Sequence, residues 1–240
     1  MKNDSILCSK ELRKIILDTA LQAGAKSAHL GGALSIVDVI SVLYSKSFLK
    51  FDSKNPKSPE RDRLILSKGH CCLAYYALLN LMGFISKEDL SKFESDGATL
   101  LGHPVKNLEK GIEFSTGSLG MGISIAIGIC LAAKLNSKNF QVFSIIGDGE
   151  ANEGSVWEAI MAAPNFNINN LTIILDKNNY QQTGSTLDIM NNDNFYEKFK
   201  SFGWETYDID GHNHAEIEKA LKEKTKKPKA IIANTIKGKG

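Results

Sequence analysis

The stretch that decides the fold runs from residue 142 to residue 179: it opens with VFSIIGDGE (142–150) and closes with LTIILDKNN (171–179). Each segment is an apolar, β-branched run followed directly by Gly, Asp or Asn, which is the pattern of a buried strand that ends in a turn. A helical segment that begins near Glu153 separates the two. Because parallel strands are joined by right-handed helical crossovers, both strand ends should lie at the same edge of a sheet, where ligands bind in α/β folds.

The same alternation of strands and helices continues along the chain. We expect strands at 140–146, 171–175, 204–209 and 229–234, and helices at 156–163, 194–202 and 215–224. This pattern indicates an α/β fold in which helices cover both faces of a parallel sheet. The sequence shows no internal repeat and no obvious linker, so we predict one domain that spans residues 1–240.

The first 135 residues favour helices and loops, so the N-terminal half should be rich in helix. We expect a helix at 10–23 capped by Ser9, helical apolar spacing at 36–43 and 73–81, and a short helix opened by Ser86 and Asp89. The glycine-rich segment 117–122 leads into a helix that is apolar on nearly every side. Such a helix should lie at the centre of the fold.

The composition argues against several classes of partner. The net charge is +2, from 29 basic and 27 acidic residues, so no global field attracts nucleic acid or an anionic membrane. The lysine-rich run 222–229 should cap and solvate the end of a helix. The most apolar segment, 121–133, is too short to cross a bilayer, and the first ten residues do not have the layout of a signal peptide. Four cysteines without metal-ligand spacing suggest reduced thiols, and we expect a soluble, cytoplasmic protein.

Asp148, Asn178 and Tyr180 form the candidate metal site. Mg²⁺ prefers oxygen ligands, and these residues offer a carboxylate, an amide oxygen and a backbone carbonyl. Gly147 and Gly149 let the backbone approach a phosphate, and the start of the following helix favours an anion. Singly, each segment would be an ordinary turn. Together, 30 residues apart (178 minus 148) and each after an apolar strand, they favour one site for a metal and a diphosphate.

At these residues the sequence resembles the thiamine-diphosphate enzymes, whose signature is Gly-Asp-Gly followed about 30 residues later by Asn. Among them it is similar to transketolase, and in particular to the amino-terminal subunit of the split, two-chain form. Matching motifs extend over nearly the whole chain. They are KSAHLGG (26–32), RDR (61–63), SKGH (67–70), GHP (102–104), STGSLG (115–120), GDGE with EG (147–150 and 153–154), DGH (210–212) and TIKGKG (235–240).

The resemblance implies roles for individual residues. His70 would contact the cofactor diphosphate, and His29 and His103 would face the sugar substrate, where histidine suits proton transfer. All three are therefore candidate catalytic residues. The remaining expected cofactor contacts are Gly117 and Leu119 at the aminopyrimidine, Gly147, Asp148, Gly149 and Glu150 in the signature loop, and Asn178, Tyr180 and Gln182 after the second strand.

Three positions leave alternatives open. Glu153, with Glu158 nearby, resembles the carboxylates that link cofactor sites across the family's dimer, but it is equally an ordinary glutamate at a helix start. Gln182 stands where transketolases usually have an apolar side chain packed on the thiazolium ring. His212 and His214 form a His-x-His pair that could bind metal, although a structural role in a polar turn is the plainer interpretation.

The implied reaction is the transfer of a two-carbon ketol unit from a ketose, free or phosphorylated, to an aldose. Thiamine diphosphate would supply the carbanion, with Mg²⁺, or Ca²⁺ or Mn²⁺, as the metal. A separate pyrimidine-binding subunit should complete the site in an α2β2 assembly, since such oligomers favour two-fold symmetry. The sequence after Asn178 is also similar to the α subunits of 2-oxoacid dehydrogenases. A cofactor-binding structural partner without turnover is a further hypothesis, against which intact Asp148, Asn178 and His70 argue.

Overall fold

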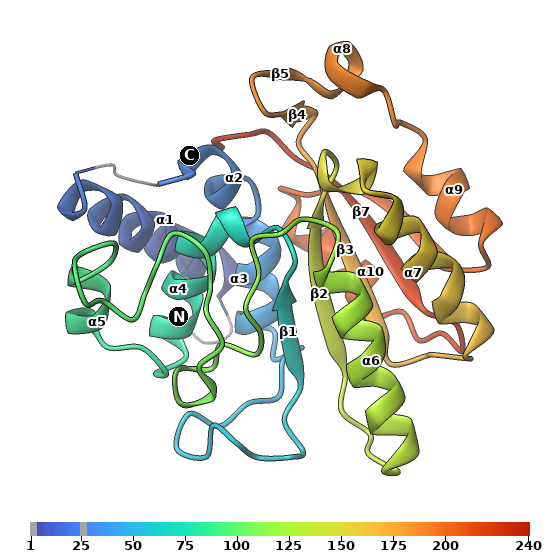
Figure 1. Cartoon of the computed structure of the whole chain (residues 1–240), viewed down its shortest axis with the longest axis horizontal. Coiled ribbons are helices and arrows are strands. Elements are labelled where there is room, and N and C mark those ends of the chain that lie inside the picture. Colours follow the sequence, from blue (N-terminus) through green and yellow to red (C-terminus); the bar gives the residue numbers. More distant parts are fainter. Residues whose placement is uncertain (1–3, 25–27) are drawn as a thin grey trace.

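A five-stranded parallel sheet forms the centre of the protein, in the order β1-β2-β3-β7-β6. The computed structural model describes residues 4–24 and 28–240. Figure 1 shows the strands running side by side, with helices in front of and behind them. The strands are β1 (Arg63–Leu66), β2 (Val142–Gly147), β3 (Leu171–Lys177), β6 (Glu205–Asp210) and β7 (Lys229–Asn234). The predicted α/β class is thereby confirmed.

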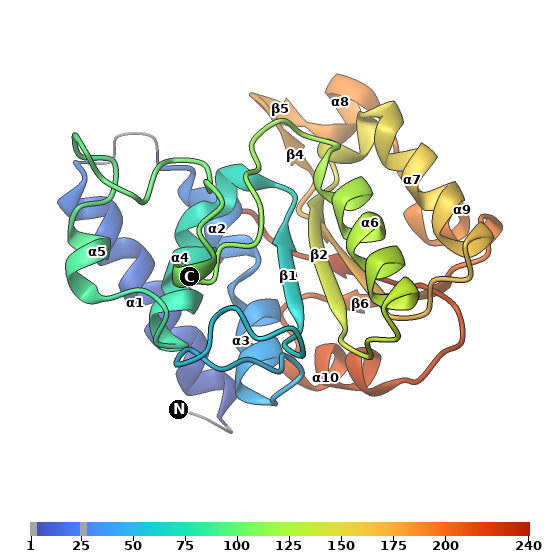
Figure 2. The same ribbon diagram turned by 60° about the horizontal axis from the view of Figure 1, so that its bottom comes forward.

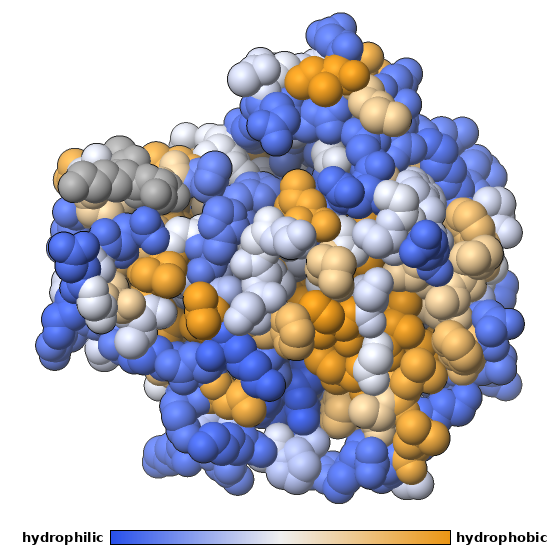
Figure 3. Space-filling model, viewed as in Figure 1, coloured by the Kyte–Doolittle hydropathy of each residue, from blue (hydrophilic) through white to orange (hydrophobic). Residues whose placement is uncertain are grey.

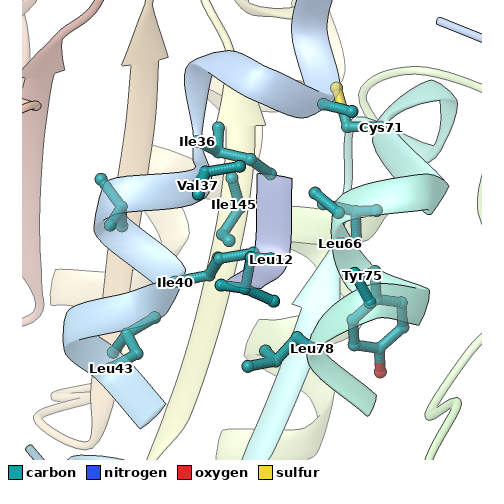
Figure 4. Close-up of a cluster of buried hydrophobic side chains, with 14 of the residues drawn as sticks. Leu12, Ile36, Val37, Ile40, Leu43, Leu66, Cys71, Tyr75, Leu78 and Ile145 are labelled. Atoms are coloured by element: carbon teal, nitrogen blue, oxygen red, sulfur yellow. The ribbon is translucent and has the colours of Figure 1, made fainter. Parts of the chain in front are cut away.

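Side chains of the strands alternate between two separate apolar cores, as the two-residue period of a strand requires. Phe143, Ile145 and Ile174 join the core on one face of the sheet. The helices on that face are α1 (Ser5–Gln22), α2 (Leu30–Ser35), α3 (Val37–Ser45), α4 (Cys72–Leu81) and α10 (His214–Lys222). Figure 4 shows this core, where Leu12, Ile40 and Leu78 meet Ile145.

The opposite face of the sheet buries Val142, Ile146 and Ile173. It is covered by α6 (Gly122–Leu135), α7 (Gly154–Asn165) and α9 (Phe195–Ser201). Trp204 fills this core, and its indole N–H donates to the carbonyl of Ile160 at 2.8 Å. The 60° rotation in Figure 2 separates this group of helices from the group around α1 and α4.

Smaller elements lie between the main ones. They are α5 (Lys87–Ser91), α8 (Thr186–Met190), the hairpin of β4 (Tyr180–Gln181) and β5 (Gly184–Ser185), and the 3-10 turns Gly69–Cys71, Leu108–Lys110 and Glu150–Asn152. Ser86 and Asp89 form a reciprocal capping box at α5, as the sequence predicts. The hairpin projects from the carboxyl edge of the sheet, and Figure 1 shows it at the top.

Two expectations for the N-terminal half are wrong. The first helix begins at Ser5, because the Asp4 carboxylate caps it by accepting the N–H groups of Ile6 and Leu7, each at 3.0 Å. Ser9 lies inside the helix, is buried, and donates to the carbonyl of Ile6. The apolar helix that follows segment 117–122, α6, does not lie at the centre of the fold. It lies on the outside of the sheet and leaves Met121 at its start and Leu135 at its end 51% and 85% exposed.

Other sequence expectations have clear outcomes. All four cysteines are buried and free of disulfide bonds. Lys229, the last residue of the lysine-rich run, caps α10 by donating to the carbonyls of Ala220, Leu221 and Glu223, although it is itself buried. Within residues 4–24 and 28–240, no helix combines the length and the apolarity that crossing a membrane requires.

Candidate cofactor site at the carboxyl edge of the sheet

The ends of β2 and β3 bring the predicted metal ligands together. Gly147 pairs with Asp176 in the parallel register, so Asp148 and Asn178 follow neighbouring strands at the same edge. The Asp148 carboxylate is 4% exposed and accepts the N–H groups of Gly149 at 2.8 Å and Asn179 at 2.6 Å. Burial, together with the nearby Asp176 carboxylate, raises the pKa of Asp148 to about 6. The Lys68 charge offsets this rise only in part, and a buried carboxylate of this kind favours a cation beside it.

The side-chain amide of Asn178 has a fixed orientation. Its Nδ2 donates to Asp176 Oδ2 at 2.8 Å, and its Oδ1 accepts the N–H of Tyr180 at 3.1 Å. The amide oxygen therefore lies on the side of the Tyr180 backbone and keeps a lone pair for a further partner. Carboxylate, amide oxygen and backbone carbonyl are hard oxygen donors, so the residues present fit Mg²⁺ or a similar cation.

A buried ion pair supports this strand end, and reasoning from the sequence missed it. Lys68 and Asp176 are each 1% exposed and form a salt bridge between Nζ and Oδ2. Asp176 also accepts the hydroxyls of Ser35, at 2.7 Å, and Thr235. Although burial opposes ionisation of both groups, their attraction lowers the pKa of Asp176 and raises that of Lys68. The place of Asp176 at the end of an apolar strand was the signal that could have identified it.

Glu150 binds the neighbouring loops to one another. It is 2% exposed; its carboxylate accepts the N–H groups of Gly120 at 2.9 Å and Gly147 at 3.1 Å, and the hydroxyl of Ser67. Burial raises its pKa. The side chain thus points into the protein, where it fixes the loops on which the other candidate residues lie.

Glycines allow the loops around residues 69 and 117 to approach each other closely. A Cβ atom on Gly69 would lie 2.8 Å from the backbone nitrogen of Gly117, and a Cβ atom on Gly122 would lie 2.5 Å from the Ser67 hydroxyl. Gly117 has φ +143°, which favours glycine. Leu119 lies in the same loop and is partly buried. The 115–120 motif therefore forms one wall of the site.

The three candidate catalytic histidines form a cluster. The ring of His29 lies 5.6 Å from that of His70 and 6.1 Å from that of His103, measured between centroids. Burial, then Lys68 and the two other imidazoles, lowers the pKa of His70 to about 3, and burial also lowers that of His29. The rings of His70 and His29 are therefore neutral at pH 7. Lys26 and Ser27, from the same motif as His29, lie outside the described residues.

Other candidates lie at the margin. Tyr180 is 53% exposed, and Gln182 is exposed at the tip of the β4–β5 hairpin with φ +48°. Glu153 precedes α7 at the surface without capping it through its side chain. His212 and His214 lie elsewhere and contact Asp38, and the part of the chain that the structure describes contains no cluster of residues suited to hold a metal through His, Cys, Asp and Glu alone. A structural role for the two histidines is the one that the geometry favours.

Comparison with known proteins places this chain in a family. Residues 6–240 match the family model described as "Transketolase, thiamine diphosphate binding domain". The chain is 36% identical over 237 residues to an apulose-4-phosphate transketolase subunit from Phocaeicola vulgatus, covering 98% of this chain and 83% of that protein. It is 40% identical over 232 residues to the 6-deoxy-6-sulfo-D-fructose transketolase subunit SqwG from a Clostridium species, covering 95% and 83%.

Solved structures show the same fold. The transketolase of Campylobacter jejuni superposes with a TM-score of 0.88 at 34% identity, over 95% of this chain and 37% of that one. The transketolase of Leishmania mexicana has a TM-score of 0.88 at 28% identity, over 98% and 37%. The chain thus spans most of the separate subunits that it resembles, and little more than a third of these longer transketolases.

Proposed function

The chain belongs to the transketolase family, whose thiamine diphosphate binding domain it comprises, and on this premise we propose that it is the cofactor-binding subunit of a two-chain transketolase. Ketol transfer of two carbons is the reaction of this family. The observation that carries the proposal is the pair of neighbouring strand ends that brings the buried oxygen donors of Asp148 and Asn178 to one edge of the sheet, where they would hold Mg²⁺. The domain would span residues 1–240.

Each group of residues has a part in this function. Asp148, the amide oxygen of Asn178 and the carbonyl of Tyr180 would hold the cation, and Gly147, Gly149 and His70 would meet the diphosphate. Thiamine diphosphate, when bound, supplies the carbanion that carries the two-carbon unit. Gly117 and Leu119 offer backbone groups to its aminopyrimidine. The neutral His29, with His103 beside it, would accept and return a proton at the hydroxyl and carbonyl oxygens of the sugar.

The substrate is proposed to be a ketose that bears an anionic group. Two relatives that span most of this chain are named for apulose 4-phosphate and for 6-deoxy-6-sulfo-D-fructose, a phosphorylated and a sulfonated sugar. Both names join a sugar with a strongly acidic group. We infer the same class for this chain, in sugar metabolism in the cytoplasm.

The surface of α6 supports a partner subunit. Its outward side leaves Met121, Ser124, Gly128, Ala132 and Leu135 exposed. Figure 3 shows apolar residues over this helix and its neighbour α7, on both sides of a strip of near-neutral residues, and Met161 of α7 is 58% exposed. Apolar patches of this kind mark protein interfaces. Glu153 and Glu158 are exposed beside it, at the start of α7. A pyrimidine-binding subunit packed here, in an α2β2 assembly, would complete the cofactor site.

Calorimetry tests the cofactor assignment. Thiamine diphosphate with Mg²⁺ is titrated into the purified complex of this chain with the product of the adjacent gene. Asp148→Ala should abolish metal-dependent binding, because the diphosphate then lacks its cation. Asp18→Ala, on the exposed side of α1, is the matched control for loss of an aspartate. Binding by Asp148→Ala as tight as by the wild type would contradict the metal site.

Assembly and turnover test the enzyme assignment. The chain alone should be inactive, whereas the mixture with its partner should elute as one complex and transfer a ketol unit between sugars. Gly128→Asp should prevent assembly without lowering the stability of the isolated chain, because a Cβ at Gly128 meets no atom within 4 Å. Full activity of the chain alone, or turnover of 2-oxoacids in place of ketoses, would refute the proposal.

A further inference from the structure

A buried carboxylate outside the cofactor site joins four segments of the chain. Asp38 of α3 is 5% exposed. It accepts two hydrogen bonds from Arg13 of α1, at 3.0 and 2.8 Å, and contacts Nδ1 of His212 at 2.8 Å and Nε2 of His214 at 3.1 Å. Although burial opposes ionisation, the hydrogen bonds from Arg13 and His212 lower the pKa of Asp38 to about 2. The network is therefore built around a permanent negative charge.

His212 connects this charge to the segment after β7. Its Nε2 accepts the backbone N–H of Ile236 at 2.8 Å. Because a backbone N–H can only donate, Nε2 must be unprotonated, and the ring proton lies on Nδ1, directed at Asp38. The tautomer is thus set from both sides, and the neutral imidazole bridges α3 and residue 236.

The segment 235–239 is held at several points and crosses the carboxyl edge of the sheet towards α2, as Figure 1 shows. Two side chains of the Asp38 network bind it: His212 in its middle, at the Ile236 N–H, and Arg13 near its end, where Nε donates to the Lys239 carbonyl at 3.1 Å. Further contacts of the segment include Thr235 Oγ1 to Asp176, Thr235 N–H to the Lys177 carbonyl at 3.0 Å, Lys239 N–H to the Ile236 carbonyl at 3.1 Å, and Gly238 N–H to the Gly31 carbonyl at 2.9 Å.

Lys237 extends from this segment to the margin of the candidate site, where its side chain is exposed. Its side chain lies flat against Gly31, where an added Cβ would be 3.0 Å from Lys237 Cγ. Its ammonium lies 5.4 Å from the centre of the Tyr180 ring. Burial, then His103 and Lys237, lowers the pKa of His29, which places the lysine charge near the histidine cluster. Lys237 thus brings a positive charge to a site that we assign to anions.

We propose that His212 is a positioning residue: anchored on Asp38 through Nδ1, it accepts the Ile236 N–H at Nε2 and so fixes the backbone from which Lys237 reaches the cofactor site. This inference rests on the proposed function, because it needs an anion at the site. The contacts of His212 are with Asp38 and the Ile236 backbone, so we assign its effect on binding to the placement of Lys237.

A double-mutant cycle tests that route. Thiamine diphosphate with Mg²⁺ is titrated into the assembled enzyme carrying His212→Ala, Lys237→Met or both. We expect His212→Ala to weaken binding about fivefold, the equivalent of one net hydrogen bond. In the Lys237→Met background it should have no further effect. His214→Ala is the matched control: it also loses a contact with Asp38, but leaves Ile236 untouched, so its affinity should stay within about twofold of wild type.

Rescue provides a second measurement. His212→Gln keeps an acceptor for Ile236 and a donor for Asp38, and should bind more tightly than His212→Ala. Equal losses from His212→Ala in both backgrounds, no loss in Lys237→Met, or a His214→Ala effect as large as that of His212→Ala would overturn the inference.

Failure of the proposed function would be visible separately, as a wild type that binds no thiamine diphosphate. In that case hydrogen exchange decides the remaining claim: the Ile236 amide should exchange faster in His212→Ala and remain protected in His214→Ala. Equal protection in the two variants would overturn it.

Discussion

Replacing the two buried carboxylates at neighbouring strand ends should change stability in opposite directions when no cofactor is bound. Asp176 has Lys68, Ser35, Thr235 and Asn178 as partners. Asp148 has two backbone N–H groups, a repelling carboxylate and a weaker attraction to the Lys68 charge. Asp176→Asn should therefore destabilise the chain, whereas Asp148→Asn should stabilise it near pH 8.

The magnitudes follow from burial and from pKa. Asp176→Asn leaves the Lys68 ammonium, 1% exposed, without its counter-charge; breaking such a pair costs about 3–5 kcal/mol. For Asp148, a pKa of about 6 against the ordinary value of 3.8 corresponds to about 3 kcal/mol. Asparagine avoids this penalty but loses one acceptor, worth about 1 kcal/mol. The net gain at pH 8 is about 2 kcal/mol.

The sign for Asp148 depends on pH. Its folded-state pKa is raised, so the folded chain binds more protons than the unfolded chain between these two values, and wild-type stability falls as pH rises through that window. Below about pH 4 the carboxyl is protonated in both states, and the penalty that asparagine avoids is absent. The gain in Asp148→Asn should therefore be present at pH 8 and absent at pH 4.

Urea denaturation in the presence of EDTA measures both effects. The free energies of unfolding of wild type, Asp148→Asn and Asp176→Asn are compared at pH 8 and at pH 4. Addition of Mg²⁺ and thiamine diphosphate should then stabilise wild type and leave Asp148→Asn unchanged, because only a competent site gains from ligand. An Asp148→Asn variant that is as unstable as Asp176→Asn at pH 8 would refute the reasoning, since Asp148 would then be a structural group.

Three further outcomes are expected. His103→Ala should lower kcat/KM for a ketose about 100-fold while calorimetry finds the affinity for thiamine diphosphate within about twofold of wild type; equal loss of both would make His103 a cofactor ligand. Gln182→Leu should tighten cofactor binding by about 1–2 kcal/mol if the side chain at position 182 covers the thiazolium. A fall in turnover alone would instead place Gln182 at the substrate. Leucine is preferred to isoleucine because a β-branched residue is strained at φ +48°. Asp38→Asn should lower the free energy of unfolding by about 2 kcal/mol at pH 7. The pKa of Asp38 is lowered to about 2, so the stability that its charge contributes is lost only as pH falls from 3.8 through that value. Urea titrations should therefore show a smaller difference in stability between wild type and variant at pH 3 than at pH 7, and an equal difference would contradict the charge as the cause.

The sequence was most informative where local pattern and topology agree. The runs at 142–147 and 171–177 are long enough to show a buried strand, and each ends in residues that form turns. Parallel pairing then leaves one arrangement for Asp148 and Asn178, because crossover handedness fixes which strand ends meet. The meeting of these two residues was therefore predictable, and the structure places them at neighbouring strand ends as expected.

Features that depend on distant contacts were not predictable. Lys68 and Asp176 are 108 residues apart, and nothing in the sequence indicates that these two residues pair with each other. The edge strand β1, Arg63–Leu66, has four residues, too few to establish a period. At the N-terminus, Asp4 and Ser9 are both good caps by residue type. Asp4 caps the helix because the turn before Ser9 is already helical, which the sequence does not reveal.

The prediction that α6 lies at the centre of the fold was wrong for a different reason, which connects the fold to the function. An apolar pattern records that a helix is buried but does not record by what. In the isolated chain, α6 buries Ile123, Ala126, Ile127 and Cys130 against the sheet and leaves the opposite side uncovered. A helix of a monomer would carry polar residues there, because exposed apolar area gives no stability. The exposed side of α6 instead carries Met121, Gly128, Ala132 and Leu135, with Ser124 and Lys134 as its polar residues. This composition favours a partner subunit on the side that the sheet does not cover.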